Sequence, residues 1–236
     1  MKAVSLVTTA PFALLLAARF VNILFGLGTV WLVLDMGKRL FDRRKAWIAA
    51  AFVGLLPGSL FVFTYVNCDA LAVFSTAVIV YAWVRYLDEG WTYKNCVILA
   101  LGVAACALSY YNAYGWILCS FFFFCLTILL CREEAFGQRV KFLFSRGLAI
   151  TGVTLGLCGW WFIRNGLLYN GDILGRKASA ACAEKYALKD YRPSNYPTPQ
   201  KLGWTWKDIL IYQDPGWYHN WALTVCVSFI GTFGLM

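Results

Sequence analysis

The chain consists of apolar runs separated by short charged connections, and each run is about as long as a membrane is thick. A helix needs about 20 apolar residues to cross the ~30 Å hydrocarbon core of a bilayer. The sequence therefore predicts an all-α fold, a polytopic transmembrane helical bundle that forms one domain over residues 1–236. We expect about seven spans, at residues 19–36, 46–66, 69–85, 95–111, 114–131, 147–164 and 217–236.

The composition excludes the other common classes of protein. Hydrophobic residues make up 61% of the chain, aromatic residues 18% and charged residues 14%. Soluble domains contain about 45–50% apolar and about 25% charged residues, so we expect neither a soluble domain nor a nucleic-acid partner. The nine cysteines form no C-x-x-C pair, and no residues have metal-ligand spacing, so the motifs predict no metal site. Membrane lipids are the expected surroundings.

The basic residues predict how the bundle is oriented. Segment 37–45 contains five Lys and Arg residues, segment 85–94 contains two and segment 131–146 contains four, whereas the turns at 67–69 and 112–114 contain none. Because Lys and Arg concentrate in cytoplasmic connections, we predict a multi-pass protein of the cell membrane whose connection from Lys38 to Lys45 is cytoplasmic. The long loop 165–216 is then extracytoplasmic. Its seven Lys and Arg residues carry less weight, since long loops follow the charge rule poorly.

Polar residues end the outgoing spans at one predicted depth, the outer boundary of the membrane. Arg19 and Arg164 at this boundary are suited to binding phosphate, because a guanidinium offers forked hydrogen-bond donors. Asp69 could orient an acceptor or a metal. Each residue also has a simpler interpretation. The aspartate could cap a helix, the arginines could extend to the interface, and the asparagines could join helices. The predicted substrate-binding residues are Arg19, Asn67, Asp69, Asn112, Arg164 and Asn165.

Two further features concern the continuity of the chain. Pro57 lies inside the second predicted span, where a proline removes a backbone hydrogen bond and bends the helix. At the N-terminus the predicted topology begins outside with residues 4–18, which are already apolar, and at the C-terminus the last span stops at Met236 without flanking charge. The two ends predict either a compact seven-span protein or a piece of a longer one, and we favour the piece.

Several motifs in this order resemble the GT-C glycosyltransferase superfamily, in particular the protein mannosyltransferase-like branch and related bacterial membrane proteins. The motifs are RFVN at 19–22, GKRLF at 37–41, LLPG at 55–58, YVNCDAL at 65–71, WWFIRN at 160–165, YNGD at 169–172 and SFIGTFG at 228–234. The resemblance implies transfer of a sugar from a polyprenyl-phosphate donor to an envelope acceptor on the extracytoplasmic side. It also allows a divalent metal ion, although no cofactor is certain.

The resemblance leaves the catalytic residue unknown. Members of the family keep a catalytic acid in a first outer loop that follows an N-terminal span, and this sequence contains no counterpart of that loop. Asp69 is therefore a candidate only for orienting the acceptor or a metal. The alternative functions are a transporter or flippase, or a non-catalytic membrane subunit, that handles a lipid-linked glycan.

Overall fold

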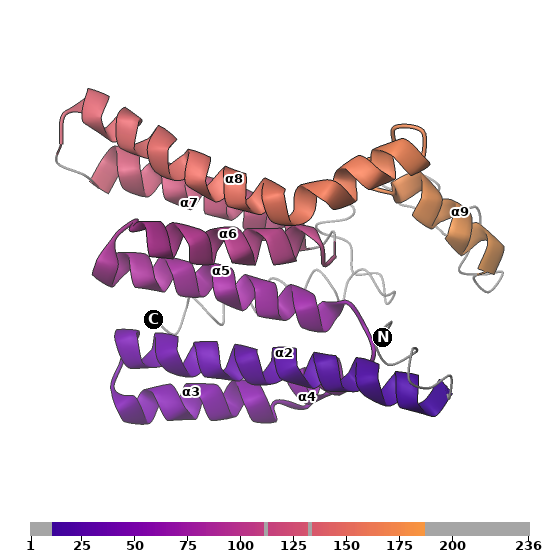
Figure 1. Cartoon of the computed structure of the whole chain (residues 1–236). Helices are drawn as coiled ribbons and strands as arrows, with labels where there is room; N and C mark the ends of the chain where they lie inside the picture. The colour runs from indigo at the N-terminus through magenta and orange to yellow at the C-terminus, as the bar shows by residue number, and fades with distance from the viewer. Residues whose placement is uncertain (1–10, 111–112, 132–133, 187–236) are drawn as a thin grey trace, which may run out of the picture. The chain divides into compact units, whose positions relative to one another are not determined.

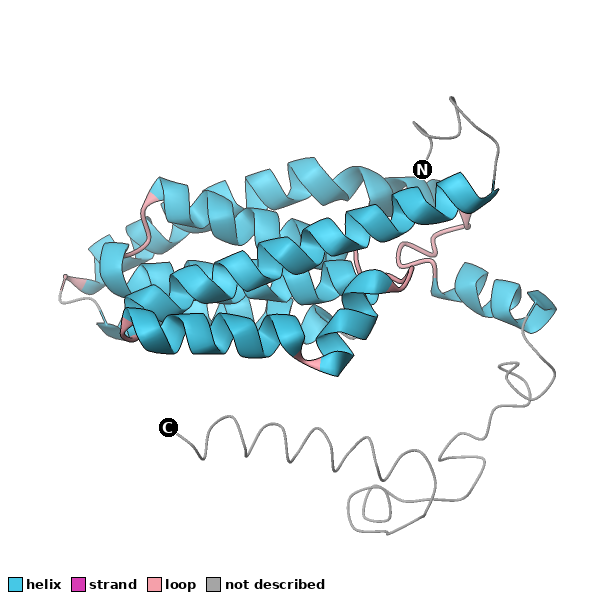
Figure 2. Ribbon diagram, turned by 90° about the horizontal axis from the view of Figure 1, so that it is seen from below, coloured by secondary structure: helices cyan, strands magenta, loops and turns pink. Residues whose placement is uncertain are grey.

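The described part of the chain is built from helices and their connections. The computed structural model describes residues 11–110, 113–131 and 134–186. Figures 1 and 2 show helices and no strand among these residues. The chain divides into two compact units, Met1–Leu168 and Tyr169–Met236, and each is described by itself. The all-α fold expected from the apolar runs is thus confirmed.

The first half of the first unit contains α2 (Pro11–Leu40), α3 (Arg43–Leu55), α4 (Pro57–Thr64) and α5 (Asp69–Glu89). Helix α2 packs against the other three (Figure 1). Close approach to α3 requires a glycine, since a Cβ atom at Gly37 would lie 2.9 Å from the Cα atom of Ala46. Small residues of this kind let membrane helices pack closely.

The second half of this unit contains α6 (Tyr93–Ala107), α7 (Tyr114–Cys131) and α8 (Phe136–Leu168). Helix α6 lies between α5 and α8 and packs against both (Figure 1). The buried core joins α5, α6 and α7 and includes Ile79, Trp91, Leu99, Phe124 and Ile128. Helix α6 is central to this core, because it packs against α5, α7 and α8.

Fewer helices qualify as membrane spans than the sequence predicted. Four described helices are long and apolar enough to cross a membrane, or five if the bent pair α3 and α4 is one span. Helix α6 has 15 residues and is about 22 Å long, which is shorter than the ~30 Å hydrocarbon core. The predicted span 217–236 lies outside the described residues. The expected number of about seven spans is therefore not confirmed.

The break at Pro57 is confirmed. Helix α3 ends at Leu55 and α4 begins at Pro57, and the two axes are bent by 59°. Proline occupies the first turn of α4, where its missing N–H costs no helical hydrogen bond.

Helix boundaries differ from the prediction where charged residues lie inside a helix. Helix α2 begins at Pro11, so Arg19 does not open the first span but lies two turns inside it. Arginine is a good helix former, and the charge does not interrupt the helix. For the same reason α2 continues through Lys38 to Leu40, and the predicted connection 38–45 shrinks to residues 41–42 between α2 and α3.

At the other boundary, α8 continues to Leu168, so Asn165 lies in the helix rather than in the loop 165–216. Asn170 and Gly171 follow, with φ angles of 50° and 86°, a left-handed conformation that ends a helix.

The described part of the second unit is a short turn and one helix, α9 (Arg176–Tyr186). Asp172 caps this helix: its carboxylate accepts hydrogen bonds from the backbone N–H groups of Arg176, Lys177 and Ala178 at 3.1, 2.7 and 3.2 Å. The loop predicted at 165–216 thus contains a capped helix, and its remainder lies outside the described residues.

Candidate functional site

The best-defined group of polar residues at the predicted outer boundary surrounds the link between α4 and α5. Asn22 of α2 is buried, with 7% of its surface exposed. Its amide Nδ2 donates to the backbone carbonyls of Tyr65, at 2.5 Å, and Asn67, at 3.3 Å. One side chain therefore ties the link 65–68 to the neighbouring helix. Asn22 is not among the residues predicted for the site, and a lone amide inside an apolar run was the available signal for it.

Asn67 joins the two helices on either side of this link. Its Nδ2 donates to the carbonyl oxygen of Val62 in α4, at 3.2 Å, and its Oδ1 accepts from the N–H of Ala70 in α5, at 3.0 Å. These bonds satisfy backbone groups that helix ends leave unpaired. In this structure the asparagine therefore has a capping role.

Asp69 is exposed and is the first residue of α5. The negative charge is favourable there because the positive end of the helix dipole lies at the N-terminus. Its side chain makes no cap hydrogen bond that we observe, whereas Asn67 does. The carboxylate is thus held at the surface by the ordered segment before it.

Arg19 is exposed and lies three residues before Asn22 on α2. Residues three apart are neighbours on a helix surface, so the guanidinium belongs to the same end of the bundle as Asn67 and Asp69. These residues come from α2, from the α4–α5 link and from the start of α5, and α2 packs against both α4 and α5.

Arg164 and Asn165 form a separate group on α8. The guanidinium of the exposed Arg164 lies 5.4 Å from the ring centre of Trp161, one turn earlier, and Asn165 is buried. Helices α5 and α6 lie between α2 and α8 (Figure 1). The described helices therefore do not bring Arg164 together with Arg19. Asn112 lies outside the described residues.

The opposite end of the bundle contains a network of charged residues that join α2 to α5. Arg39 bonds Asp35, Asp88 and Glu89 at 3.3, 3.0 and 3.5 Å. Tyr81 donates to Asp35 at 2.9 Å, and the buried Arg85 pairs with Glu89. Sequence analysis used these arginines only to predict orientation. The spacing of four residues in Asp35–Arg39 and Arg85–Glu89 was the signal that they pair.

The side chains available at the Asp69 end are a carboxylate, amides and a guanidinium cation. Among the described residues, no group of three or more His, Cys, Asp and Glu side chains could hold a metal ion.

Comparison with known proteins gives one match. The model of a family described as dolichyl-phosphate-mannose-protein mannosyltransferase matches residues 6–157, which include helices α2 to α7 and the first part of α8. No curated protein and no solved structure matches the chain.

Proposed function

The chain belongs to the dolichyl-phosphate-mannose-protein mannosyltransferase family, a GT-C type of membrane glycosyltransferase, and from this premise we propose that it transfers a sugar from a polyprenyl-phosphate donor to an acceptor in the cell envelope. The single observation that carries the proposal is the family match, which covers residues 6–157. Helices long and apolar enough to cross a membrane agree with a lipid-linked donor.

We place the reaction at the end of the bundle that contains Asp69, and on the extracytoplasmic side. The distribution of Lys and Arg supports this orientation, because the basic segments 37–45, 85–94 and 131–146 all belong to the opposite end of the helices. The end of α2 that contains Lys38 is then cytoplasmic, and the part of the loop 165–216 that follows α8 is extracytoplasmic.

The roles of the residues follow from the leaving group. A polyprenyl phosphate departs as an anion, so the site needs a cation to stabilise the developing charge and a base for the acceptor hydroxyl. We propose that Arg19 binds the phosphate and that Asp69 orients the acceptor or a divalent metal ion. Asn67 fixes the position of Asp69 through its bonds to both helix ends. The base itself is not assigned.

We propose a second set of substrate contacts from Asn112, Arg164 and Asn165. Arg164 is exposed next to an aromatic ring, a surrounding that suits a phosphate or sugar contact at the membrane surface. Since α8 does not pack against α2, these residues would bind another part of the donor or the acceptor, rather than share one phosphate with Arg19.

The test is sugar transfer by the whole protein in membranes, with a radiolabelled polyprenyl-phosphate sugar as donor. We expect Asp69→Asn and Arg19→Gln each to lower kcat/KM by about tenfold or more, which corresponds to about 1.4 kcal/mol of transition-state stabilisation. Arg44→Gln is the matched control, because Arg44 is exposed at the opposite end of the bundle. Unchanged kcat/KM in both variants, with the wild-type protein active, would refute the placement of the site.

A further inference from the structure

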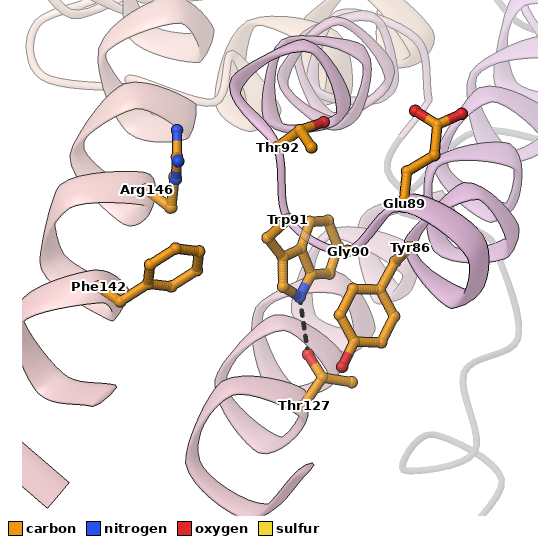
Figure 3. Close-up of a pocket in the computed structure, with 8 residues that line it drawn as sticks. All are labelled: Tyr86, Glu89, Gly90, Trp91, Thr92, Thr127, Phe142 and Arg146. Carbon is orange, nitrogen blue, oxygen red and sulfur yellow. Dashed lines mark hydrogen bonds between the residues drawn. The ribbon is translucent and has the colours of Figure 1, made fainter. Parts of the chain in front are cut away.

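A cavity of about 410 Å³ lies at the end of the bundle opposite Asp69. It is an open pocket lined by the α5–α6 turn, by α7 and by α8, and its volume falls in the range of about 300–1,000 Å³ that is usual for small-molecule sites. Figure 3 shows Arg146 and Phe142 on the α8 side, facing Trp91 and Thr92 of the turn. Trp91 is fixed there because its Nε1 donates to the hydroxyl of Thr127 at 2.9 Å.

Arg146 gives the cavity an unpaired positive charge. Its guanidinium lies 3.4 Å from the ring centre of Tyr93 and 5.1 Å from that of Phe142. Its Nη1 is buried, and no residue in the described part of the chain accepts a hydrogen bond from it. A buried donor without a partner is costly, so the aromatic rings position a cation whose hydrogen-bonding capacity is unused.

The acidic residue that lines the same cavity does not neutralise Arg146. Glu89 pairs instead with Arg85 and Arg39, and Arg146 takes part in no ion pair among the described residues. An anion in the cavity would therefore meet a free guanidinium, which forms its strongest hydrogen bonds with phosphate and carboxylate oxygens.

An apolar groove of about 610 Å³ follows the cavity along the same helices. On α8 its lining begins at Leu143 and Gly147, beside Arg146, and continues to Leu155. On α7 it includes Phe124, one turn from Thr127 of the cavity. The stretch of α8 from 143 to 155 is about 18 Å long, which is close to half of the ~30 Å hydrocarbon core and hence to one leaflet.

We propose that the cavity and the groove together bind an anionic glycerophospholipid, with its phosphate on Arg146 and one acyl chain between α7 and α8. The positive charge of Arg146 favours an anionic headgroup. The apolar lining of the groove, which is about one leaflet deep, favours an acyl chain. The orientation predicted from Lys and Arg places the cavity in the cytoplasmic leaflet, which is rich in anionic lipids. This site is separate from the donor site, which we place at the other end of the bundle.

The first test measures binding of phosphatidylglycerol and phosphatidylcholine to the delipidated whole protein, by native mass spectrometry and by the shift in melting temperature. We expect phosphatidylglycerol to bind about tenfold more tightly than phosphatidylcholine. Both lipids carry a phosphate, but the quaternary ammonium group of phosphatidylcholine brings a second cation close to Arg146, and like charges repel. Arg146→Gln should remove this preference, and Arg146→Lys should keep part of it. Arg44→Gln, the same change on an exposed residue at this end, should leave it intact.

The second test addresses the acyl chain and does not depend on the arginine. A Cβ atom at Gly147 would point toward Phe124, 3.7 Å from its Cε1 atom, whereas one at Gly152 on the same helix meets no atom within 4 Å. Gly147→Leu should therefore fill the groove and weaken phosphatidylglycerol binding about tenfold, and Gly152→Leu should not.

Three results would overturn the proposal, and none involves sugar transfer, so they are distinct from a failure of the proposed function. The first is a preference for phosphatidylglycerol that survives Arg146→Gln. The second is equal binding of phosphatidylglycerol by Gly147→Leu and Gly152→Leu. The third is an equal rise in melting temperature with inorganic phosphate and with phosphatidylglycerol. A fourth result, displacement of the bound phospholipid by a polyprenyl phosphate, would overturn the choice of occupant.

Discussion

Replacement of Asn22 by leucine tests whether one side chain orders the segment that presents Asp69. Leucine has the same number of side-chain heavy atoms as asparagine, with the same branching at Cγ, and suits the apolar surroundings of α2, but it cannot donate a hydrogen bond. Asn22→Leu therefore leaves the carbonyls of Tyr65 and Asn67 without the donor that they have in the native structure. Both effects of interest, on stability and on activity, follow from that loss.

The expected destabilisation can be worked out from the two bonds. Each intramolecular hydrogen bond contributes about 0.5–1.5 kcal/mol, so the loss of both should lower the free energy of unfolding by about 1–3 kcal/mol. The lower half of that range is the better expectation for two reasons. The two hydrogen bonds are only partly buried, so water competes for them. In membrane proteins, interhelical hydrogen bonds average about 0.6 kcal/mol.

The matched control is Thr29→Val on the same helix. Thr29 is also buried, but its hydroxyl donates to the carbonyl of Phe25 within α2, at 2.8 Å. That carbonyl already accepts a helical N–H, so we expect a change below about 0.5 kcal/mol. Unfolding is measured by titration with sodium dodecyl sulfate, and transfer activity is measured under native conditions. Equal stability of the two variants would refute the reasoning, as would full activity of Asn22→Leu at the proposed site.

Two other predictions concern helix packing and orientation. Gly37→Ala should destabilise the bundle by about 1–3 kcal/mol, because the new methyl group overlaps Ala46. Gly152→Ala, where nothing lies within 4 Å, should stabilise it by about 0.5–1 kcal/mol; changes of the same sign in both variants would contradict the packing argument. A variant that retains Cys68 alone, which is exposed beside Asp69, should react with a membrane-impermeant maleimide in intact cells. Labelling only after the membrane is made permeable would show that the predicted orientation is wrong.

The helices were predictable because the signals that define them are local. An apolar run of sufficient length needs no knowledge of its neighbours, and the structure has a helix at each predicted span within the described residues. The break at Pro57 was predictable for the same reason, since proline disrupts the hydrogen bonds of its own helix. Helix ends were less accurate, because Arg19 and Lys38 marked charge rather than the end of a helix.

The candidate site depends on which helices are neighbours, and the sequence contains little information about that. A common depth was all that grouped Arg19 with Arg164, and depth does not determine on which side of a bundle a residue lies. Asn67 shows the other limit. Its residue type predicted either a cap or a ligand. The positions of Val62 and Ala70 show the capping hydrogen bonds, and the role as a ligand stays a prediction.

The basic residues at the other end of the bundle show how one charge can serve two purposes. Orientation depends on the number of Lys and Arg residues and is largely insensitive to acids, so Asp35, Asp88 and Glu89 do not weaken the orientation that Arg39 and Arg85 favour. After folding, the same acids pair with those arginines and join α2 to α5. Arg146 counts equally toward orientation, yet no acid pairs with it in the described helices. The fold thus separates cations that stabilise helix packing from one that remains available to an anionic ligand.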